Sequence, residues 1–272
     1  MKRMKVSKGE LELGRFRVPY RVYGTAQKTI VCISGAKQTM AAWRSFVRHF
    51  VHQFSVVVFD LPGQGRCEIL HGSPSITFDE QVDVLHGVVD ATNQGDRVHL
   101  AAASWGTIIS VALAAKHPEL IDKMLLGSFG AKPSRAVIEV IRAGKELFHA
   151  GRQEEIAPLM IETFGQFIPE THKKQMRDQF STMSHEQLIS FYEHCEFVEK
   201  SKDIRDFIDL SRIKATTLIV AGEHDAILDH DDVADASKRI PDCELRVIPG
   251  AGHFLHWERA DILNTYSEFL AA

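Results

Sequence analysis

Residues Leu100–Thr107 have the sequence LAAASWGT, in which an apolar run ends in a serine and an apolar helical pattern follows at once. Ala102 and Gly106 stand two positions before and after Ser104, which matches the small-x-Ser-x-small pattern of a nucleophile elbow. So sharp a turn needs small side chains there, lifts the hydroxyl above the strand end, and places a helix N-terminus beneath it that favours negative charge. The stretch predicts acyl chemistry through an ester of Ser104, although a plain tight turn also fits the motif alone.

An acid and a histidine follow Ser104 in the order that this chemistry requires. The apolar run 217–221 predicts a buried strand, and Asp225 comes just beyond its end. The run 244–248 predicts another strand, which leads into the glycine-rich loop that carries His253. Taken singly, Asp225 fits a turn former and His253 a surface residue. Taken in order, they favour a triad with Ser104 as nucleophile, His253 as base and Asp225 as the acid that orients the base.

Two backbone N–H groups are needed to hold the oxyanion of an acyl-transfer intermediate. We expect the first from Trp105, the residue after the nucleophile. The second is expected from the loop 34–37, which follows the predicted strand 30–33. Within this loop Ala36 is the candidate donor, and Gly35 lets the backbone approach closely.

The composition is that of an ordinary globular protein. The 272 residues are 44% hydrophobic and 25% charged, with a formal net charge of −4. This balance disfavours a nucleic-acid partner, and no apolar run reaches the ~20 residues of a membrane span. The basic start lacks the apolar segment of a signal peptide. The four cysteines have no zinc-site spacing, so we expect no metal or other cofactor and a cytoplasmic protein.

Strand-like and helix-like runs alternate along most of the chain, which is typical of a mostly parallel, doubly wound α/β sheet. The expected strands are 15–23, 30–33, 56–59, 98–102, 123–126, 217–221 and 245–248. The expected helices are 40–51, 78–91, 105–116, 231–239 and 258–270. The near-continuous apolar runs of the central strands indicate a sheet that is covered on both faces.

The strand pattern stops between Ala131 and about Arg205, where apolar residues recur at helical spacing. We expect residues 131–205 to form a helical cap that is inserted before the last two core strands. The core would then comprise residues 1–130 and 206–272.

The cap is rich in aromatic residues, most of which are expected to form its own core. Together they also predict an apolar pocket for an acyl chain above the serine, with Phe164, Phe167 and Tyr192 as candidates. The adjacent His194 and Cys195 are expected to pack within the cap without a catalytic role.

The serine turn, the acid loop and the histidine loop together resemble the α/β-hydrolase superfamily over nearly the whole chain. A narrower resemblance links the chain to 3-hydroxyacyl-carrier-protein:CoA transacylases and to the synthase that makes 3-(3-hydroxyalkanoyloxy)alkanoate for rhamnolipids. It rests on VVVFDLP at 56–62, ASWG at 103–106, ETFGQFIP at 162–169 and GAGHFL at 250–255. The cap stretch is the most specific of these. The chain departs from this branch at PGQGR, 62–66, and beside the acid, which leaves the substrate open.

The resemblance implies that Ser104, activated by His253, attacks a 3-hydroxyacyl thioester and forms an acyl-enzyme. Three acceptors remain open: the hydroxyl of a second hydroxyacyl group, CoA, or water. The alternatives are a carboxylesterase or thioesterase and a non-catalytic, ligand-sensing protein of the same fold.

An acyl carrier protein would be an acidic partner, so a basic surface should receive it. Lys173, Lys174 and Arg177 cluster in the cap and are candidates for this surface. The plainer interpretation of these three side chains is a solvated helix face.

Overall fold

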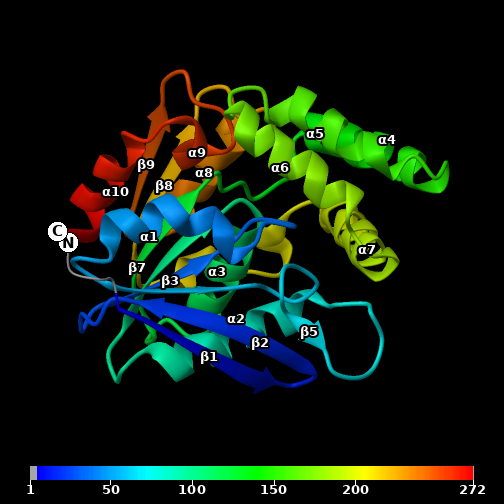
Figure 1. Ribbon diagram of the computed structural model, residues 1–272. Coiled ribbons are helices and arrows are strands. Elements are labelled where there is room, and N and C mark those ends of the chain that lie inside the picture. Colours follow the sequence, from blue (N-terminus) through cyan, green and yellow to red (C-terminus); the bar gives the residue numbers. More distant parts are fainter. Residues whose placement is uncertain (1–4, 272) are drawn as a thin grey trace.

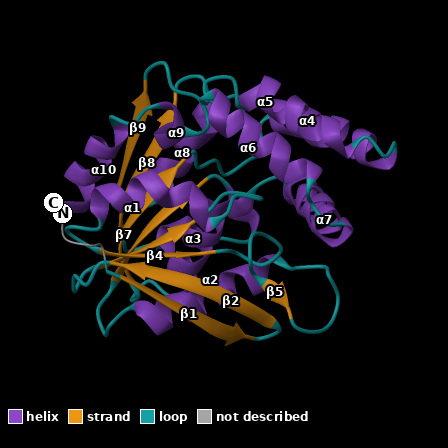
Figure 2. Ribbon diagram, in the orientation of Figure 1, coloured by secondary structure: helices purple, strands orange, loops and turns teal. Residues whose placement is uncertain are grey.

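The computed structural model describes residues 5–271, which form a twisted sheet with helices packed on both faces (Figures 1 and 2). The strands are β1 (Val6–Leu13), β2 (Phe16–Tyr23), β3 (Thr29–Ile33), β4 (Ser55–Phe59), β5 (Glu68–Ile69), β6 (Val98–Ala103), β7 (Ile121–Gly127), β8 (Thr216–Gly222) and β9 (Cys243–Ile248). Their order across the sheet is β1-β2-β4-β3-β6-β7-β8-β9, with β5 paired to β2. The pairs from β4 to β9 are parallel, whereas β1, β2 and β5 pair antiparallel.

The helices connect these strands and cover both faces of the sheet. They are α1 (Arg44–Phe50), α2 (Phe78–Thr92), α3 (Trp105–Lys116), α4 (Arg135–His149), α5 (Ile156–Phe164), α6 (Glu170–Ser181), α7 (His185–Ser201), α8 (His230–Arg239), α9 (Leu255–Glu258) and α10 (Ile262–Ala271). Figure 1 shows α1 and α10 side by side against the sheet.

The apolar strands are buried on both faces because successive side chains point in opposite directions. In β3, Val31 and Ile33 belong to the apolar cluster that includes side chains of α2, α3 and α8. Their neighbours Ile30 and Cys32 pack on the other face with side chains of α1 and α10. The predicted fold class, a mostly parallel doubly wound sheet with helices inserted before its last two strands, is confirmed.

Two of the expected helices are interrupted or begin differently. The predicted helix 258–270 is interrupted at residues 259–261, so α9 and α10 are separate helices. The expected helix 40–51 begins as a 3₁₀ turn, Met40–Trp43, before α1 starts at Arg44.

Helices α4 to α7 follow β7 and precede β8, within the segment that the sequence predicts as a cap. Figure 1 shows them grouped together, on the side where the parallel strands end. They have an apolar cluster of their own, built around Ile156, Ala157 and Phe180. The expectation that aromatic residues such as Phe180 form the interior of this segment therefore matches their place.

The two ends of this segment are fastened to each other and to α8. The Ile204 N–H donates to the Ala131 carbonyl at 3.0 Å. Asp232 of α8 accepts the Ala131 N–H at 3.1 Å and a guanidinium N–H of Arg205 at 2.5 Å. The buried Asp232 carboxylate thus contacts the four-helix segment both where the chain enters it, at Ala131, and where the chain leaves it, at Arg205.

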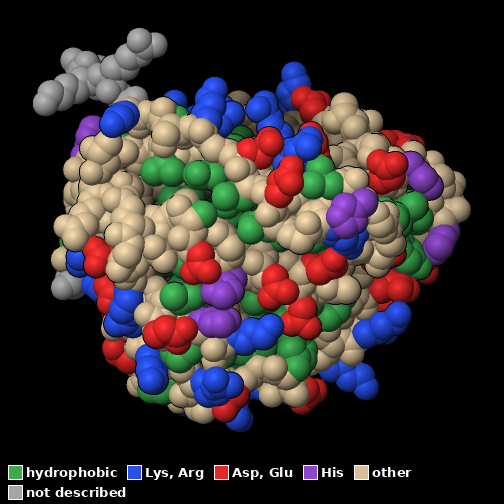
Figure 3. Space-filling view, turned by 90° about the horizontal axis from the view of Figure 1, so that it is seen from below, with side chains coloured by type: hydrophobic (Ala, Val, Ile, Leu, Met, Phe, Trp, Pro, Cys, Tyr) green, Lys and Arg blue, Asp and Glu red, His purple; other side chains and the backbone are tan. Residues whose placement is uncertain are grey.

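The surface carries charges of both signs. On the face seen in Figure 3, Lys and Arg side chains are intermingled with Asp and Glu. Among residues 5–271, no helix combines the length and the apolar character that crossing a membrane requires.

Candidate active site

Ser104 stands at the turn between the end of β6 and the start of α3. Its backbone has φ of 50° and ψ of −122°, a strained conformation for a residue with a side chain. The Ser104 N–H donates to the Gly127 carbonyl at 2.9 Å, which fixes the turn to β7. A Cβ at Gly106 would lie 2.4 Å from the Ile33 carbonyl oxygen, so only glycine lets α3 approach β3 this closely. The strain and the close approach together present the Ser104 hydroxyl beyond the strand end.

Three side chains from distant parts of the sequence meet at this turn. Nε2 of His253 lies 3.0 Å from Oγ of Ser104. Nδ1 of the same ring lies 2.9 Å from Oδ2 and 3.0 Å from Oδ1 of Asp225. Asp225 follows β8 and His253 follows β9, so adjacent parallel strands deliver both to the edge where Ser104 stands.

The Asp225 side chain is wholly excluded from solvent, and that of His253 is 4% exposed. Burial by itself would raise the pKa of the Asp225 carboxyl. The interaction with His253 and a hydrogen bond from the Ile227 N–H outweigh burial and hold that pKa below its usual value. An ionised carboxylate only accepts hydrogen bonds, so Nδ1 of His253 carries the proton and Nε2 is left to accept from Ser104.

Ser128 is a supporting residue that the sequence patterns did not single out. It follows β7 with φ of 56°, and its hydroxyl donates to the His253 carbonyl at 2.9 Å. The contact joins loops 125 residues apart in the sequence, which no local pattern can reveal.

The two expected oxyanion donors, Ala36 and Trp105, both line the cavity above Ser104. Within the described residues, neither backbone N–H donates a hydrogen bond to another protein group. Gly35 lets this loop close in, because a Cβ there would lie 3.2 Å from the Cβ of Ser104. The arrangement leaves two N–H groups available beside the serine.

The loop that carries Ala36 is held by residues that sequence reasoning missed. Gln64 accepts the Lys37 N–H at 2.8 Å and donates to the Gly35 carbonyl at 3.3 Å. The Lys37 ammonium is buried and donates to the Gly63 carbonyl at 2.8 Å and to the Ser190 hydroxyl of α7 at 3.4 Å. Burial lowers the pKa of Lys37 to about 8. The loop that carries Ala36 is therefore tied both to the core and to α7.

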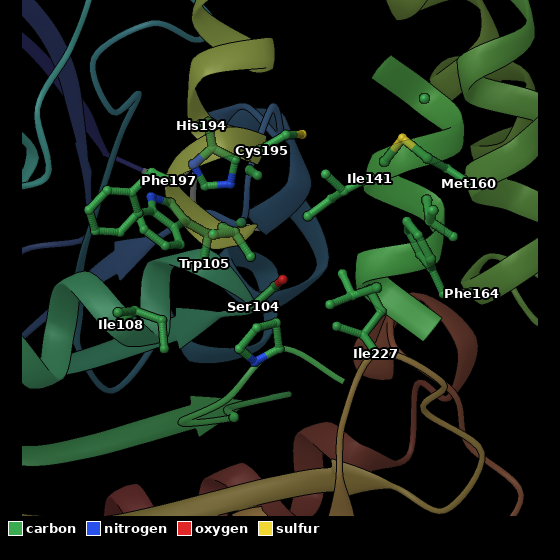
Figure 4. Close-up of a pocket in the computed structure, with 18 of the residues that line it drawn as sticks. Ser104, Trp105, Ile108, Ile141, Met160, Phe164, His194, Cys195, Phe197 and Ile227 are labelled. Atoms are coloured by element: carbon green, nitrogen blue, oxygen red, sulfur yellow. The ribbon is translucent and has the colours of Figure 1, made fainter. Parts of the chain in front are cut away.

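A cavity of about 230 Å³ opens above Ser104 between the sheet and helices α4, α5 and α7. Figure 4 shows Ser104 near its centre, with Ile141, Met160 and Phe164 on one side and Trp105, His194 and Phe197 on the other. Most of the lining side chains are apolar.

The three residues predicted to line the pocket differ in where their side chains lie. Phe164 and Tyr192 line the cavity, and the Phe164 ring lies 5.8 Å from that of His253 in an edge-to-face contact. Phe167 does not line it; its side chain is 46% exposed and its ring stacks on His224. The assignment of Phe167 to the pocket is therefore wrong, because the turn after α5 directs its side chain outward.

His194 and Cys195, expected only to pack within the cap, both line the cavity. The His194 ring makes an edge-to-face contact with Trp105 at 4.3 Å between centroids. Burial, with a contribution from the charge of Lys37, lowers the pKa of His194 to about 3. Burial raises the pKa of the Cys195 thiol to about 12, so the thiol is protonated at neutral pH.

The candidate docking residues lie on α6. Lys173 is paired with Glu170, with Nζ and Oε1 3.0 Å apart. Lys174 and Arg177 are exposed.

A parallel α/β sheet with a strained serine at a strand-to-helix turn, and with an acid and a histidine after later strands, defines an enzyme of the α/β-hydrolase class. The chain belongs to the alpha/beta hydrolase fold family, whose model matches residues 28–260. It is similar to an (R)-3-hydroxydecanoyl-ACP:CoA transacylase of Pseudomonas putida, with 24% identity over 247 residues that cover 90% of this chain and 83% of that protein.

It is also similar to a 2-hydroxy-6-oxononadienedioate/2-hydroxy-6-oxononatrienedioate hydrolase of Escherichia coli. The two are 28% identical over 259 residues, which cover 91% of this chain and 88% of the hydrolase. Among solved structures, the α/β hydrolase MGS-M2 from a Medee basin deep-sea metagenome library aligns with a TM-score of 0.84 and 22% identity, covering 97% of this chain and 98% of its own. That structural likeness concerns the fold alone. The expectation of an α/β-hydrolase enzyme related to the transacylases is confirmed.

Proposed function

We propose that this protein is a serine acyltransferase that takes 3-hydroxyacyl groups from thioesters. The proposal is carried by one observation: His253 is hydrogen-bonded to both Ser104 and Asp225, and the three side chains lie beneath an apolar cavity. The series supplies an activated nucleophile, and the cavity suits an alkyl chain.

In the first half-reaction, Nε2 of His253 removes the Ser104 proton as Oγ attacks the thioester carbonyl carbon. The N–H groups of Ala36 and Trp105 hold the negative oxygen that forms. The carbon–sulfur bond then breaks, the thiolate takes the proton from His253, and the acyl group remains as an ester on Ser104. Asp225 stabilises the imidazolium throughout.

In the second half-reaction, an acceptor with an O–H or S–H group gives its proton to His253 and attacks the ester carbonyl. The acceptor bond forms, the bond to Oγ breaks, and Ser104 regains the proton. A hydroxyl of a second hydroxyacyl group gives a hydroxyalkanoyloxyalkanoate ester, and the thiol of CoA gives a new thioester. The likeness to the transacylase supports one of these two acceptors.

The charged side chains at the cavity favour an apolar chain over a diacid. Lys145 is paired with Glu196 and Glu199 at 3.4 and 3.2 Å, and Lys132 is 3.5 Å from Asp203. These two lysines, already neutralised in this way, contribute little to the binding of a second carboxylate, and the third lysine of the lining, Lys202, is exposed to solvent.

A hydrolase that passes the acyl group to water is the second candidate. The likeness to the Escherichia coli hydrolase supports it. So does a second space of about 40 Å³, bordered by Ala36, Gln64 and Trp105, which is large enough for water.

Mass spectrometry of the products from 3-hydroxydecanoyl thioester tests the proposal. A dimeric hydroxyacyl ester, or 3-hydroxydecanoyl-CoA made from a carrier-protein donor, supports acyl transfer. Free hydroxy acid alone shows that water is the acceptor. The Ser104→Ala variant serves as the control and should give neither product; an inactive wild-type enzyme contradicts the proposal.

A carrier-protein donor would be acidic, and the exposed Lys174 and Arg177 of α6 are the cationic side chains that we propose for its docking. Lys173 is partly neutralised by Glu170 and should contribute less. Charge reversal at Lys174 and Arg177 should raise KM for the carrier-bound substrate at low salt. An unchanged KM would remove this docking surface.

A further inference from the structure

The cavity above Ser104 contains one imidazole that the mechanism does not use. His194 projects from α7, and Figure 4 shows its ring on the same side of the cavity as Trp105, opposite Ile141, Met160 and Phe164. Its ring contacts Trp105 and borders the cavity, and neither ring nitrogen is hydrogen-bonded to the side chains and backbone groups of residues 5–271. Because these nitrogens face open space rather than the closed protein interior, they can bind a polar group of a molecule that enters the cavity.

The protonation state of His194 defines what it can bind. Burial and the charge of Lys37 hold its pKa at about 3, so the ring is neutral near pH 7. A neutral imidazole has one N–H donor and one acceptor nitrogen. That pair matches a hydroxyl group, which also donates once and accepts.

The position of the ring fits a substituent close to the reacting carbonyl. His194 lies against Trp105, whose backbone N–H is a proposed oxyanion donor, and the ring centroids are 4.3 Å apart. Carbon 3 of an acyl group is two bonds from the carbonyl carbon, so its substituent stays near the oxyanion site. The alkyl chain beyond carbon 3 would extend toward the apolar wall formed by Ile141 and Met160.

His194 also borders the smaller space beside the oxyanion loop. That space has polar walls, which include Lys37, Gln64 and Glu193. The ring therefore stands at a boundary between an apolar cavity and a polar one. An acyl chain with an oxygen on carbon 3 has the same division between a polar end and an apolar tail.

We infer that His194 is a specificity-determining residue that binds the hydroxyl on carbon 3 of the acyl group and so selects 3-hydroxyacyl over unsubstituted acyl substrates. The inference rests on the proposed function and adds to it the residue that reads the substituent. A site built to hydrogen-bond a hydroxyl discriminates strongly against the analogue that lacks it, because its own polar group is then left unpaired.

The test compares the first half-reaction, which every acceptor shares, with 3-hydroxydecanoyl-CoA and decanoyl-CoA. It measures CoA release in a single turnover with enzyme in excess, as the ratio of the two second-order rate constants. His194→Phe keeps a ring against Trp105 but removes both hydrogen-bonding nitrogens. This variant should lower the ratio by about 10-fold or more. His194→Gln keeps a donor and an acceptor and should retain a higher ratio than His194→Phe.

Val198→Ala is the matched control, because Val198 lines the same cavity one helical turn further along α7 and has no polar group. It should change both rates in the same proportion. Thermal unfolding of each variant shows whether it is folded, and His194→Gln gives an independent measurement if the phenylalanine variant is not.

The outcomes separate the inference from the proposed function. Equal use of both thioesters by the wild-type enzyme, or an unchanged ratio in His194→Phe, overturns the inference alone. Single-turnover CoA release from neither thioester by the wild-type enzyme overturns the proposed function, and the inference with it.

Discussion

Gly106 and Ile33 are in such close contact that a Cβ on the glycine would lie 2.4 Å from the Ile33 carbonyl oxygen. Gly106 belongs to the turn that presents Ser104, and Ile33 ends the strand that leads to Ala36. The contact therefore sets the distance between the proposed nucleophile and the proposed second oxyanion donor.

Gly106→Ala should separate these two elements. Because backbone rather than a flexible side chain blocks the new methyl group, the substitution should cost about 1–3 kcal/mol of unfolding free energy and reduce kcat. Gly144→Ala is the control, since α4 leaves open space around that position, and it should be neutral or stabilising by up to about 1 kcal/mol. Urea unfolding of both variants makes the comparison. A Gly106→Ala protein with wild-type stability and activity would show that the contact is unimportant.

The triad substitutions should differ in a defined way. Ser104→Ala removes the nucleophile and should lower kcat on the order of 10⁴-fold or more, with His253→Ala comparable. Asp225→Asn should cost somewhat less; its amide can donate to Nδ1 and so favour the tautomer whose Nε2 cannot accept from Ser104. Steady-state kinetics on a 3-hydroxyacyl thioester measure all three. A folded Ser104→Ala protein with wild-type turnover would refute the assignment of the nucleophile.

Lys37 should make stability depend on pH in the alkaline range. Burial lowers its pKa from 10.5 to about 8 in the folded protein, so between these values the unfolded chain binds more protons. Its contribution to stability is therefore present in full above pH 10.5 and is lost as the pH falls toward 8. The unfolding free energy of the wild type minus that of Lys37→Met should rise as the pH is raised through this window. A difference that stays constant would mean that the lysine is not buried in the folded protein.

Arg205 should be important for stability where the four-helix segment leaves the sheet. Its guanidinium binds Asp203 and Asp232, and the Asp232 side chain is only 6% exposed. Arg205→Ala would leave that carboxylate buried with one fewer cationic partner, at a cost of about 3 kcal/mol or more. Arg239→Ala removes an exposed partner of Asp235 and should cost about 0.5 kcal/mol or less. Equal losses in the two variants, measured by urea unfolding, would contradict this account.

The sequence predicted the parts of the fold that repeat a clear pattern. The central strands are continuous apolar runs, and α3 begins and ends where the apolar helical pattern after Ser104 does. The edge strand β1 was missed because VSKGELEL is rich in charged and exposed residues, and its pairing partner β2 supplies the information that it is a strand. The break between α9 and α10 was missed because residues 259–261 contain no proline or glycine to mark it.

The residues of the candidate site likewise fall into those that a sequence pattern reveals and those that it does not. Ser104, Asp225 and His253 could be found because each follows a recognisable strand and their order is constrained. Ser128, Gln64 and Lys37 could not, since they act through contacts between loops that are distant in the sequence. Phe167 was misplaced because composition indicates an aromatic cap but not which rings face inward.

Intact-protein mass spectrometry of the enzyme, quenched rapidly after mixing with 3-hydroxydecanoyl-CoA, tests the central claim most directly. The account predicts a mass increase of one 3-hydroxydecanoyl group, located on the peptide that contains Ser104 and absent from Ser104→Ala. An acyl group found instead on another residue, such as Cys195, or turnover of the thioester by Ser104→Ala at the wild-type rate, would contradict it.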